Sequence, residues 1–369
     1  MDSKKIIAVA AVAIIAIAAC AVVFMNGDDD SDSKTMVDAA GNQIKKLNGV
    51  DSITGCSSSI VDTLCYMGYG SKLVCVSNYC TNPLVPSGTP QCGSYSNPDS
   101  DAISTANADV TFLDNSGSGA KAVYETLKAS GMNVILTFGS DDGFDGIYKN
   151  IEIFGQIFGD ESKADDLVKD LKSEIKYLGE KTDGADVTEV IITTGLGNVW
   201  SADSDGNFVN LGAFDGSGVY VAGSGSTASQ FIGNVSEMKN PIEGSSWVPA
   251  DTDYISTKTA DVDVIMVTWG GTTPNADAKA KLIEQMKTTA WANCGAVQEG
   301  NIVFVCGKTN SDISRLTPYT VFDALPIMSL YMNPECYKAT AGGEALSLDD
   351  LPFYIDDSNY EMLKGYTEN

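Results

Sequence analysis

The sequence predicts an α/β protein of two lobes, each with a mostly parallel sheet flanked by helices. One long helix is expected to join the lobes, and a membrane segment is expected to precede them. Short β-branched runs alternate with helical patterns from residue 36, a long helical pattern follows at 144–181, and a second alternating series comes after it. Alternation of strands and helices is typical of crossover connections in a parallel sheet.

The first lobe is expected over residues 36–145. A helical pattern at 60–67 stops at Gly68, and another at 120–129 closes at Gly131. Between and around these helices lie short apolar or β-branched runs, which are the strand candidates: 50–54, 73–76, 110–113 and 134–137.

Residues 146–181 are expected to form the helix that bridges the lobes. Apolar residues recur at helical spacing through this stretch, and Gly155 and Gly159 are expected to interrupt the helix only locally. The second lobe and the closing helices are expected over residues 182–369. Its strand candidates follow the same pattern as those of the first lobe: 190–194, 219–222, 264–268 and 302–305.

Residues 1–26 are predicted to be a membrane anchor or signal segment. The apolar run Ile6–Met25 would span about 30 Å as a helix, which matches the hydrocarbon core of a bilayer. Two lysines precede it, so the globular part is expected on the extracytoplasmic side of the cell membrane. An uncleaved anchor is preferred, while lipidation at Cys20 and simple cleavage remain open. The acidic residues 27–35 indicate a solvated tether.

Composition excludes several classes of function. The chain has 49 acidic and 23 basic residues, a net charge of −26, which argues against nucleic acid and against anionic lipid headgroups as partners. It has no histidine, so a Ser-His-Asp triad, a His-rich zinc site and a His-ligated haem are excluded. We therefore expect neither an enzyme nor a resident metal site or intrinsic cofactor.

Nine cysteines need an explanation in an exported domain. Cys65, Cys75 and Cys306 lie in helical or strand patterns and are expected to be buried. A disulfide between Cys80 and Cys92 is the preferred interpretation of the loop cysteines. Free thiols and a thiolate metal site remain open, because the spacing matches no zinc signature.

Several stretches follow one another in a characteristic order. A serine-led helix beginning at Ser59 ends at Gly68, a short strand follows, and the loop Tyr79–Pro83 comes next. In the second lobe a glycine-rich turn at 221–226 precedes a helix, and the segment 290–305 leads into the last strand candidate. From about residue 36 onward, this order resembles the substrate-binding proteins of ABC importers for iron–siderophore complexes, haem and corrinoids.

The resemblance implies two α/β lobes with the ligand between them and a stiff helical linker that permits only modest closure. It also implies two partners, an ABC permease and its ATPase, and a small-molecule ligand that is a metal chelate or corrinoid. An oxyanion, another small solute or a non-transport surface protein remains the alternative. Docking on the permease would use one acid from each lobe, for which Asp62 and, less directly, Asp253 are the candidates.

Ligand contacts are expected where strands end, because loops and helix N-termini meet at the carboxyl edge of such sheets. Aromatic rings suit a large chelate, and Arg315, the only arginine, could pair with a ligand carboxylate or phosphate. Ser57 or Ser58 is also expected to cap the first helix. Trp291 is expected to be structural. The candidate ligand-binding residues are Ser57, Ser58, Tyr79, Tyr95, Trp200, Trp247, Trp269 and Arg315.

Overall fold

The structure is a computed structural model that describes residues 36–139, 142–194, 200–202, 208–210, 219–250, 252–270, 273–313, 315 and 317–368. The expected membrane segment (1–26), with Cys20, and the acidic tether (27–35) lie outside these ranges. Within them, no helix has both the length and the apolar character needed to cross a bilayer. The lobes described below both belong to the unit Val37–Asn369.

The first lobe is built on a four-stranded sheet in the order β2-β1-β3-β4, and every neighbouring pair of strands is parallel. Its strands are β1 (Ile53–Gly55), β2 (Leu73–Val76), β3 (Val110–Asp114) and β4 (Val134–Thr137). Its helices are α2 (Ser58–Tyr66), α3 (Ser100–Ala106), α4 (Ala120–Ala129) and α5 (Gly143–Phe158). The expected strand and helix positions of this lobe are confirmed to within a few residues.

The second lobe has a larger, mixed sheet in the order β10-β8-β5-β11-β12-β13, with β9 paired to β5. The strands β5, β11, β12 and β13 run parallel. At one edge β8 pairs antiparallel with β5, and β10 pairs antiparallel with β8. The main strands are β5 (Thr188–Thr194), β8 (Tyr220–Ala222), β9 (Met238–Lys239), β10 (Trp247–Pro249), β11 (Val264–Thr268), β12 (Ile302–Val305) and β13 (Tyr354–Ile355).

The helices of the second lobe flank this sheet and carry the chain between its strands. They are α7 (Thr227–Gly233), α8 (Thr252–Lys258), α9 (Ala276–Met286), α10 (Gly295–Glu299), α11 (Gly307–Ile313), α12 (Leu325–Met332) and α13 (Tyr360–Thr367). A separate hairpin is formed by β6 (Trp200–Ala202) and β7 (Phe208–Asn210). Trp291 is 2% exposed within the core of this lobe, so its expected structural role is confirmed.

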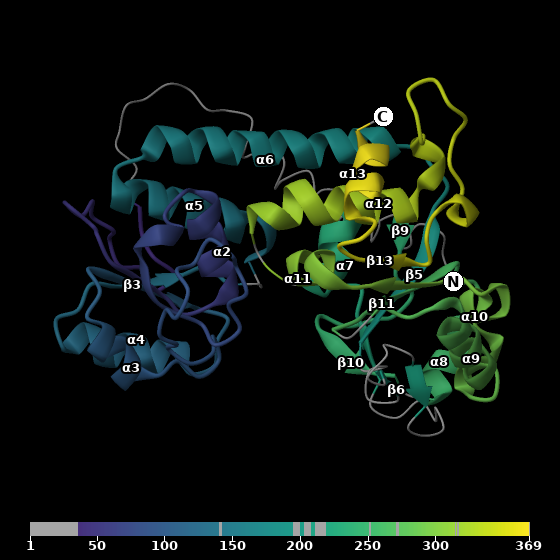
Figure 1. Cartoon of the computed structure of the whole chain (residues 1–369), viewed down its shortest axis with the longest axis horizontal. Helices are drawn as coiled ribbons and strands as arrows, with labels where there is room; N and C mark the ends of the chain where they lie inside the picture. Colours follow the sequence, from purple (N-terminus) through teal and green to yellow (C-terminus); the bar gives the residue numbers. More distant parts are fainter. Residues whose placement is uncertain are drawn as a thin grey trace, which may run out of the picture. The chain divides into compact units, whose positions relative to one another are not determined.

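The stretch expected to be one helix over 146–181 is two helices, which corrects that prediction. Helix α5 ends at Gly159, whose left-handed φ of 74° suits glycine and reverses the chain, and α6 (Glu161–Thr182) then runs back along α5. Gly155 permits the close approach, because a Cβ there would overlap the Cβ of Ala164. The lobe-bridging element is therefore α6 alone (Figure 1).

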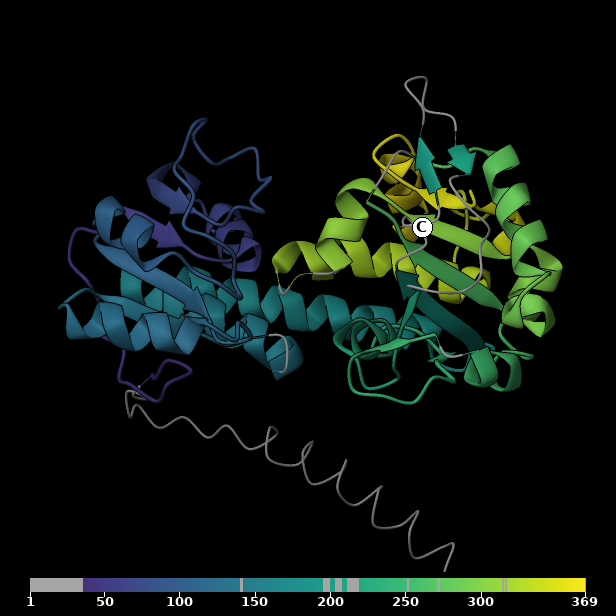
Figure 2. The same ribbon diagram turned by 90° about the horizontal axis from the view of Figure 1, so that it is seen from below.

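Each end of α6 is fixed to a different lobe. Its first half packs on α5, which in turn packs on the first sheet through Phe154 and Phe112, whose rings meet edge to face at 4.8 Å. At its other end, Lys181 donates from Nζ to the Thr367 carbonyl, 3.0 Å away in α13. Figure 2 shows the first-lobe elements, purple to blue, at one end of α6 and the green to yellow elements at the other.

Candidate functional site

The serines after β1 anchor the start of the first helix. Ser57 is buried, and its hydroxyl accepts from the Ile60 N–H at 3.2 Å, so it is the N-cap of α2 as predicted. Ser58 donates from Oγ to the Tyr79 carbonyl at 2.9 Å and thus ties this helix to the loop after β2. The hydroxyl groups of both serines therefore make hydrogen bonds within the protein.

The loop after β2 presents two exposed aromatic side chains. The Tyr79 side chain is 66% exposed and Tyr95 is 47% exposed. The backbone that carries them is held closely, because Asn78 and Gly93 exchange hydrogen bonds and a Cβ on Gly117 would overlap the Tyr95 carbonyl. Two apolar surfaces are therefore displayed on a fixed scaffold.

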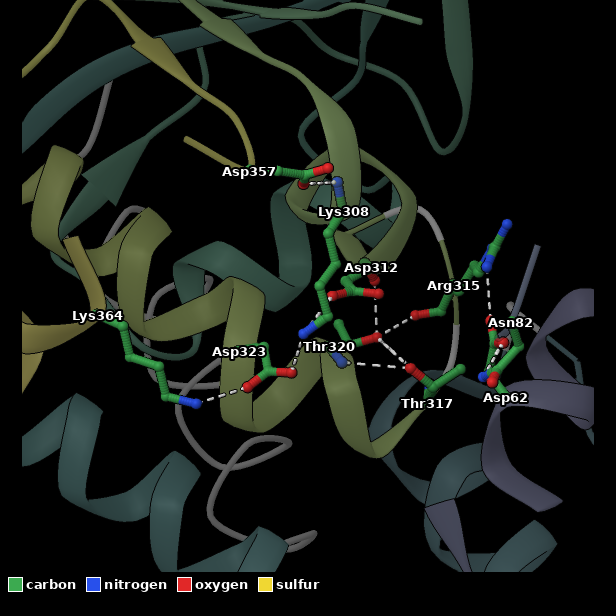
Figure 3. A network of polar contacts seen from close by, with 10 residues as sticks. All are labelled: Asp62, Asn82, Lys308, Asp312, Arg315, Thr317, Thr320, Asp323, Asp357 and Lys364. Atoms are coloured by element: carbon green, nitrogen blue, oxygen red, sulfur yellow. Dashed lines mark hydrogen bonds and ion pairs between the residues drawn. The ribbon is translucent and has the colours of Figure 1, made fainter. Parts of the chain in front are cut away.

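Asp62 and Arg315 form an ion pair that joins the lobes (Figure 3). The Arg315 guanidinium lies 2.6 Å from Oδ2 of Asp62, and the Asn82 amide donates to Oδ1 at 2.8 Å. The side chain of Asp62 is 5% exposed and that of Arg315 is 18% exposed. Both oxygens of a buried carboxylate are thus satisfied, one of them by a residue of the other lobe.

Aromatic rings of the same segments also meet between the lobes, and we call the whole set the inter-lobe contact: Asp62, Asn82, Arg315, Tyr66, Tyr319 and Phe322. Tyr66 of α2 meets Tyr319 edge to face at 5.1 Å and stacks on Phe322 at 6.0 Å. At a second place, Phe144 of α5 stacks on the buried Phe231 of α7 at 4.4 Å. The segments that follow strand ends in the two lobes therefore touch at two points.

A network of charges lies behind Arg315 in the second lobe (Figure 3). Asp323 is paired with Lys308 and with Lys364. Burial of this carboxylate by itself raises its pKa, but the two ammonium groups outweigh burial and hold the pKa below the usual value. Asp312 is 3.6 Å from Lys308, yet its Oδ2 accepts no hydrogen bond from any residue that the structure describes. Burial therefore raises the pKa of Asp312 to about 6.

The network also fixes the backbone around Arg315. The Arg315 N–H donates to the Asp312 carbonyl at 3.2 Å, and the Thr320 hydroxyl lies against the carbonyls of both residues. The hydroxyls of Thr317 and Thr320 are 3.2 Å apart, and the Thr320 N–H donates to the Thr317 hydroxyl at 3.3 Å. The position of the guanidinium is thus set by the buried turn that carries it.

Two sequence predictions concern the residues of this contact. Arg315 was expected to meet an anionic group of the ligand, but its partner in the structure is a carboxylate of the protein. Asp62 is a predicted permease contact, and in the structure its carboxylate is buried and bonded on both oxygens. Each of the two side chains neutralises the other across the lobes.

The tryptophans divide between edge and core. Trp247 opens β10 at the edge of the second sheet and is 39% exposed. Trp269 was expected to line a ligand site, and this is corrected, because it is 5% exposed and packs edge to face on Phe304 at 6.0 Å in the core. Trp200 opens β6, and Asp253 lies in α8, but their side chains fall outside what the structure describes.

The preferred disulfide between Cys80 and Cys92 is not formed, because both are free thiols. Cys80 is partly exposed, whereas Cys92 is fully buried with its sulfur 3.3 Å from that of Cys56. The expectation failed because sequence spacing does not show which way loop side chains point. Burial of Cys75 and Cys306 is confirmed, as is that of Cys65. No group of three or more Cys, Asp or Glu is arranged to hold a metal ion among the described residues.

Sequence reasoning missed Asn82, Asp312 and the aromatic partners of Tyr66. Asn82 lies in the Tyr79–Pro83 loop. An asparagine directly before a proline indicates a turn, but it does not indicate that the side chain binds a carboxylate. Asp312 and Arg315 are neighbours in sequence, whereas Asp62 is 253 residues from Arg315. Only the folded arrangement of the two lobes brings these groups together.

The Asp62–Arg315 pair gives a prediction for stability. Replacing Asp62 with Asn, or Arg315 with Leu, leaves a partly buried charge without its partner and should lower the free energy of unfolding by about 3 kcal/mol. The double variant removes both charges and should cost clearly less than the sum of the two. Urea unfolding of all four proteins gives the coupling energy. Additive losses would contradict an interaction between these side chains.

Asp312 gives a prediction for pH dependence. Its pKa is about 6 when folded and about 3.8 in the unfolded chain, so the folded state binds the proton more tightly. Stability contributed by Asp312 should therefore fall as pH rises from 4 to 6 and level off above that. The Asp312→Asn variant lacks this group. Relative to it, the wild type should lose about 2 kcal/mol between pH 4 and pH 7 in denaturant unfolding, whereas parallel curves would refute the raised pKa.

Comparisons with known proteins agree with this architecture. A structure of a periplasmic haem-binding protein from Pseudomonas aeruginosa matches with a TM-score of 0.61 at 15% identity, covering 81% of this chain and 99% of that one. The periplasmic vitamin B12-binding protein BtuF of Vibrio cholerae matches with a TM-score of 0.56 at 16% identity, covering 77% and 96%. At such identities these likenesses show the fold alone.

A curated relative is 29% identical over 167 residues, which are 42% of this chain and 52% of the relative. It is an uncharacterized ABC transporter substrate-binding lipoprotein of Bacillus subtilis, YvrC, and the match spans about half of its length. The family model described as periplasmic binding protein matches residues 53–308, well over half of the chain. The chain therefore belongs to the periplasmic binding protein family, whose members bind solutes and are not enzymes, and the resemblance seen in the sequence is confirmed.

Proposed function

We propose that this protein is the extracytoplasmic solute-binding subunit of an ABC importer, which captures a metal chelate or a corrinoid between its lobes. The observation that carries the proposal is the meeting of strand-end segments from both lobes. The segment after β1 contacts the one after β12 through Asp62 and Arg315, and those after β4 and β8 meet through Phe144 and Phe231. A ligand held where the segments after β1 and β12 meet, at the carboxyl ends of parallel strands, would be reached from two sheets at once.

The class of ligand is proposed from the side chains displayed near these edges. Tyr79 and Tyr95 offer large, exposed rings on a closely held backbone, which suit a flat or greasy chelate better than a small hydrated anion. Iron–siderophore complexes, haem and corrinoids all fit this description, and the fold is shared with structures of haem- and vitamin B12-binding proteins. An oxyanion or other small solute is the alternative, with the only arginine already committed to Asp62.

The partners are proposed to be an ABC permease and its ATPase, with the chain held at the cell membrane through residues 1–26. The curated relative is described as an ABC transporter substrate-binding lipoprotein, which supports this placement. Asp62 and Asp253 remain candidate permease contacts. Because Asp62 is buried against Arg315, its use in docking would require the inter-lobe contact to open.

A thermal-shift panel tests the proposed ligand class. The full chain is heated with haemin, cobalamin, ferric siderophores of several types, molybdate and free metal ions. At a hundredfold excess over the dissociation constant, a bound ligand adds about 2.7 kcal/mol to the free energy of unfolding. We expect one chelate or corrinoid to raise the melting temperature. Stabilisation by molybdate alone would favour the oxyanion alternative and contradict the proposal.

Tyrosine variants locate the ligand on the protein. Replacing Tyr79 or Tyr95 with Ala should weaken binding of the stabilising chelate by about tenfold, because each removes an aromatic contact surface. Tyr177 is the matched control, since it is 48% exposed but lies on the bridging helix α6. Calorimetric titration of the three variants checks the assignment. Equal affinities for all of them would place the ligand away from the β2 loop.

A further inference from the structure

We infer that Cys56 and Cys92 form a disulfide when the protein folds outside the cytoplasm. Their sulfur atoms lie 3.3 Å apart, so the pair needs to approach by only about 1.2 Å to reach bonding distance. Both side chains are completely buried. The oxidising environment that this bond requires rests on the extracytoplasmic location proposed above.

The backbone at both cysteines is fixed by strand-like hydrogen bonds. The Cys56 N–H donates to the Phe112 carbonyl at 3.0 Å, and the Cys92 N–H donates to the Val76 carbonyl at 2.8 Å. Because Cys56 directly precedes the N-cap of α2 and Cys92 sits in the loop after β2, the bond would join two segments that already pack together. It would therefore lock an existing contact without creating a new one.

The thiol of Cys75 is the other candidate partner for Cys92. Cys75 of β2 is also fully buried and hydrogen-bonds to Cys92, so three thiols gather in the core of the first lobe. Cys75 occupies a regular strand position paired with Thr54 of β1, whereas Cys56 lies just beyond the paired part of its strand. The assignment is to Cys56 because its sulfur lies 3.3 Å from that of Cys92.

The chemistry is thiol–disulfide exchange with a disulfide-containing donor, either a small molecule or an exported oxidoreductase. One cysteine thiolate attacks a donor sulfur, forms a mixed disulfide and releases the first donor thiol. The second cysteine then attacks the protein sulfur of that mixed disulfide and releases the other donor thiol. Two electrons pass from the cysteines to the donor, and the two thiol protons are taken up by the released thiolates.

Because both thiols are buried in the folded protein, the disulfide must form before folding is complete. Neither thiol is accessible in the folded protein, so exchange must precede the packing of the β2 loop onto the first sheet. Once formed, the bond would close a loop of 36 residues that contains Tyr79, and it would pin the segment that leads to Tyr95. Both proposed ligand-binding aromatics would then stand on a cross-linked scaffold.

The experiment refolds the reduced full chain, in detergent, from denaturant in a buffer of reduced and oxidised glutathione. Free thiols are then alkylated under denaturing conditions, and proteolytic peptides are mapped without reduction. We expect a peptide pair linked through Cys56 and Cys92, and a folded mass about 2 Da below that of the reduced protein. Complete alkylation of all cysteines, or a bond from Cys92 to Cys75 or Cys80, would overturn the assignment.

Serine variants make the test specific. The Cys56→Ser variant should lose the cross-link, whereas Cys75→Ser and Cys80→Ser should keep it. If the Cys56→Ser variant does not fold, the peptide map of the wild-type protein still shows whether Cys56 and Cys92 are linked. The oxidised protein should melt several degrees above the reduced protein, and equal melting temperatures would show that the bond does not fit the native fold. Ligand binding is measured separately on reduced protein, so failure of the cross-link and failure of the proposed function are distinguishable.

Discussion

A charged pair buried between two lobes constrains the rest of this molecule. Asp62 and Arg315 come from opposite ends of the chain, and each would be costly to bury without the other. Hydrogen bonds within each lobe hold both partners of the pair in place. Asn82 holds the second oxygen of Asp62, while Asp312, Thr317 and Thr320 hold the turn that carries Arg315. The ion pair thus joins the two lobes, and the rings of Tyr66, Tyr319 and Phe322 also meet between them.

The bridging helix and this contact have complementary roles. Helix α6 keeps the lobes at a set separation because it is long, regular and attached at each end by packing or hydrogen bonds. The inter-lobe contact joins the lobes through groups that can separate, since an ion pair can exchange one partner for another. If the proposed permease presents cationic side chains, these would compete with Arg315 for Asp62. A rigid frame with one exchangeable polar contact suits a protein that must hold a solute and later release it.

Much of the fold could be predicted from the sequence, because β-branched runs, helical spacing and glycine stops are local signals. Strands β2, β4, β11 and β12 coincide with their predicted ranges for this reason. The reversal at Gly159 was missed because a helical pattern on both sides of a glycine fits one helix or two. The site was harder to predict. Partners 253 residues apart carry no local signal, and neither the burial of Trp269 nor the direction of the Cys92 side chain follows from residue type.

A structure of the full chain bound to the chelate or corrinoid that it binds most tightly tests the central claim most directly. The account predicts that the ligand lies between the lobes, against the loops that follow the strands of both sheets and in contact with Tyr79 or Tyr95. Helix α6 should keep its contacts with both lobes in that structure. A ligand seated on the outer surface of one lobe, or contacting residues of only one sheet, would contradict the account.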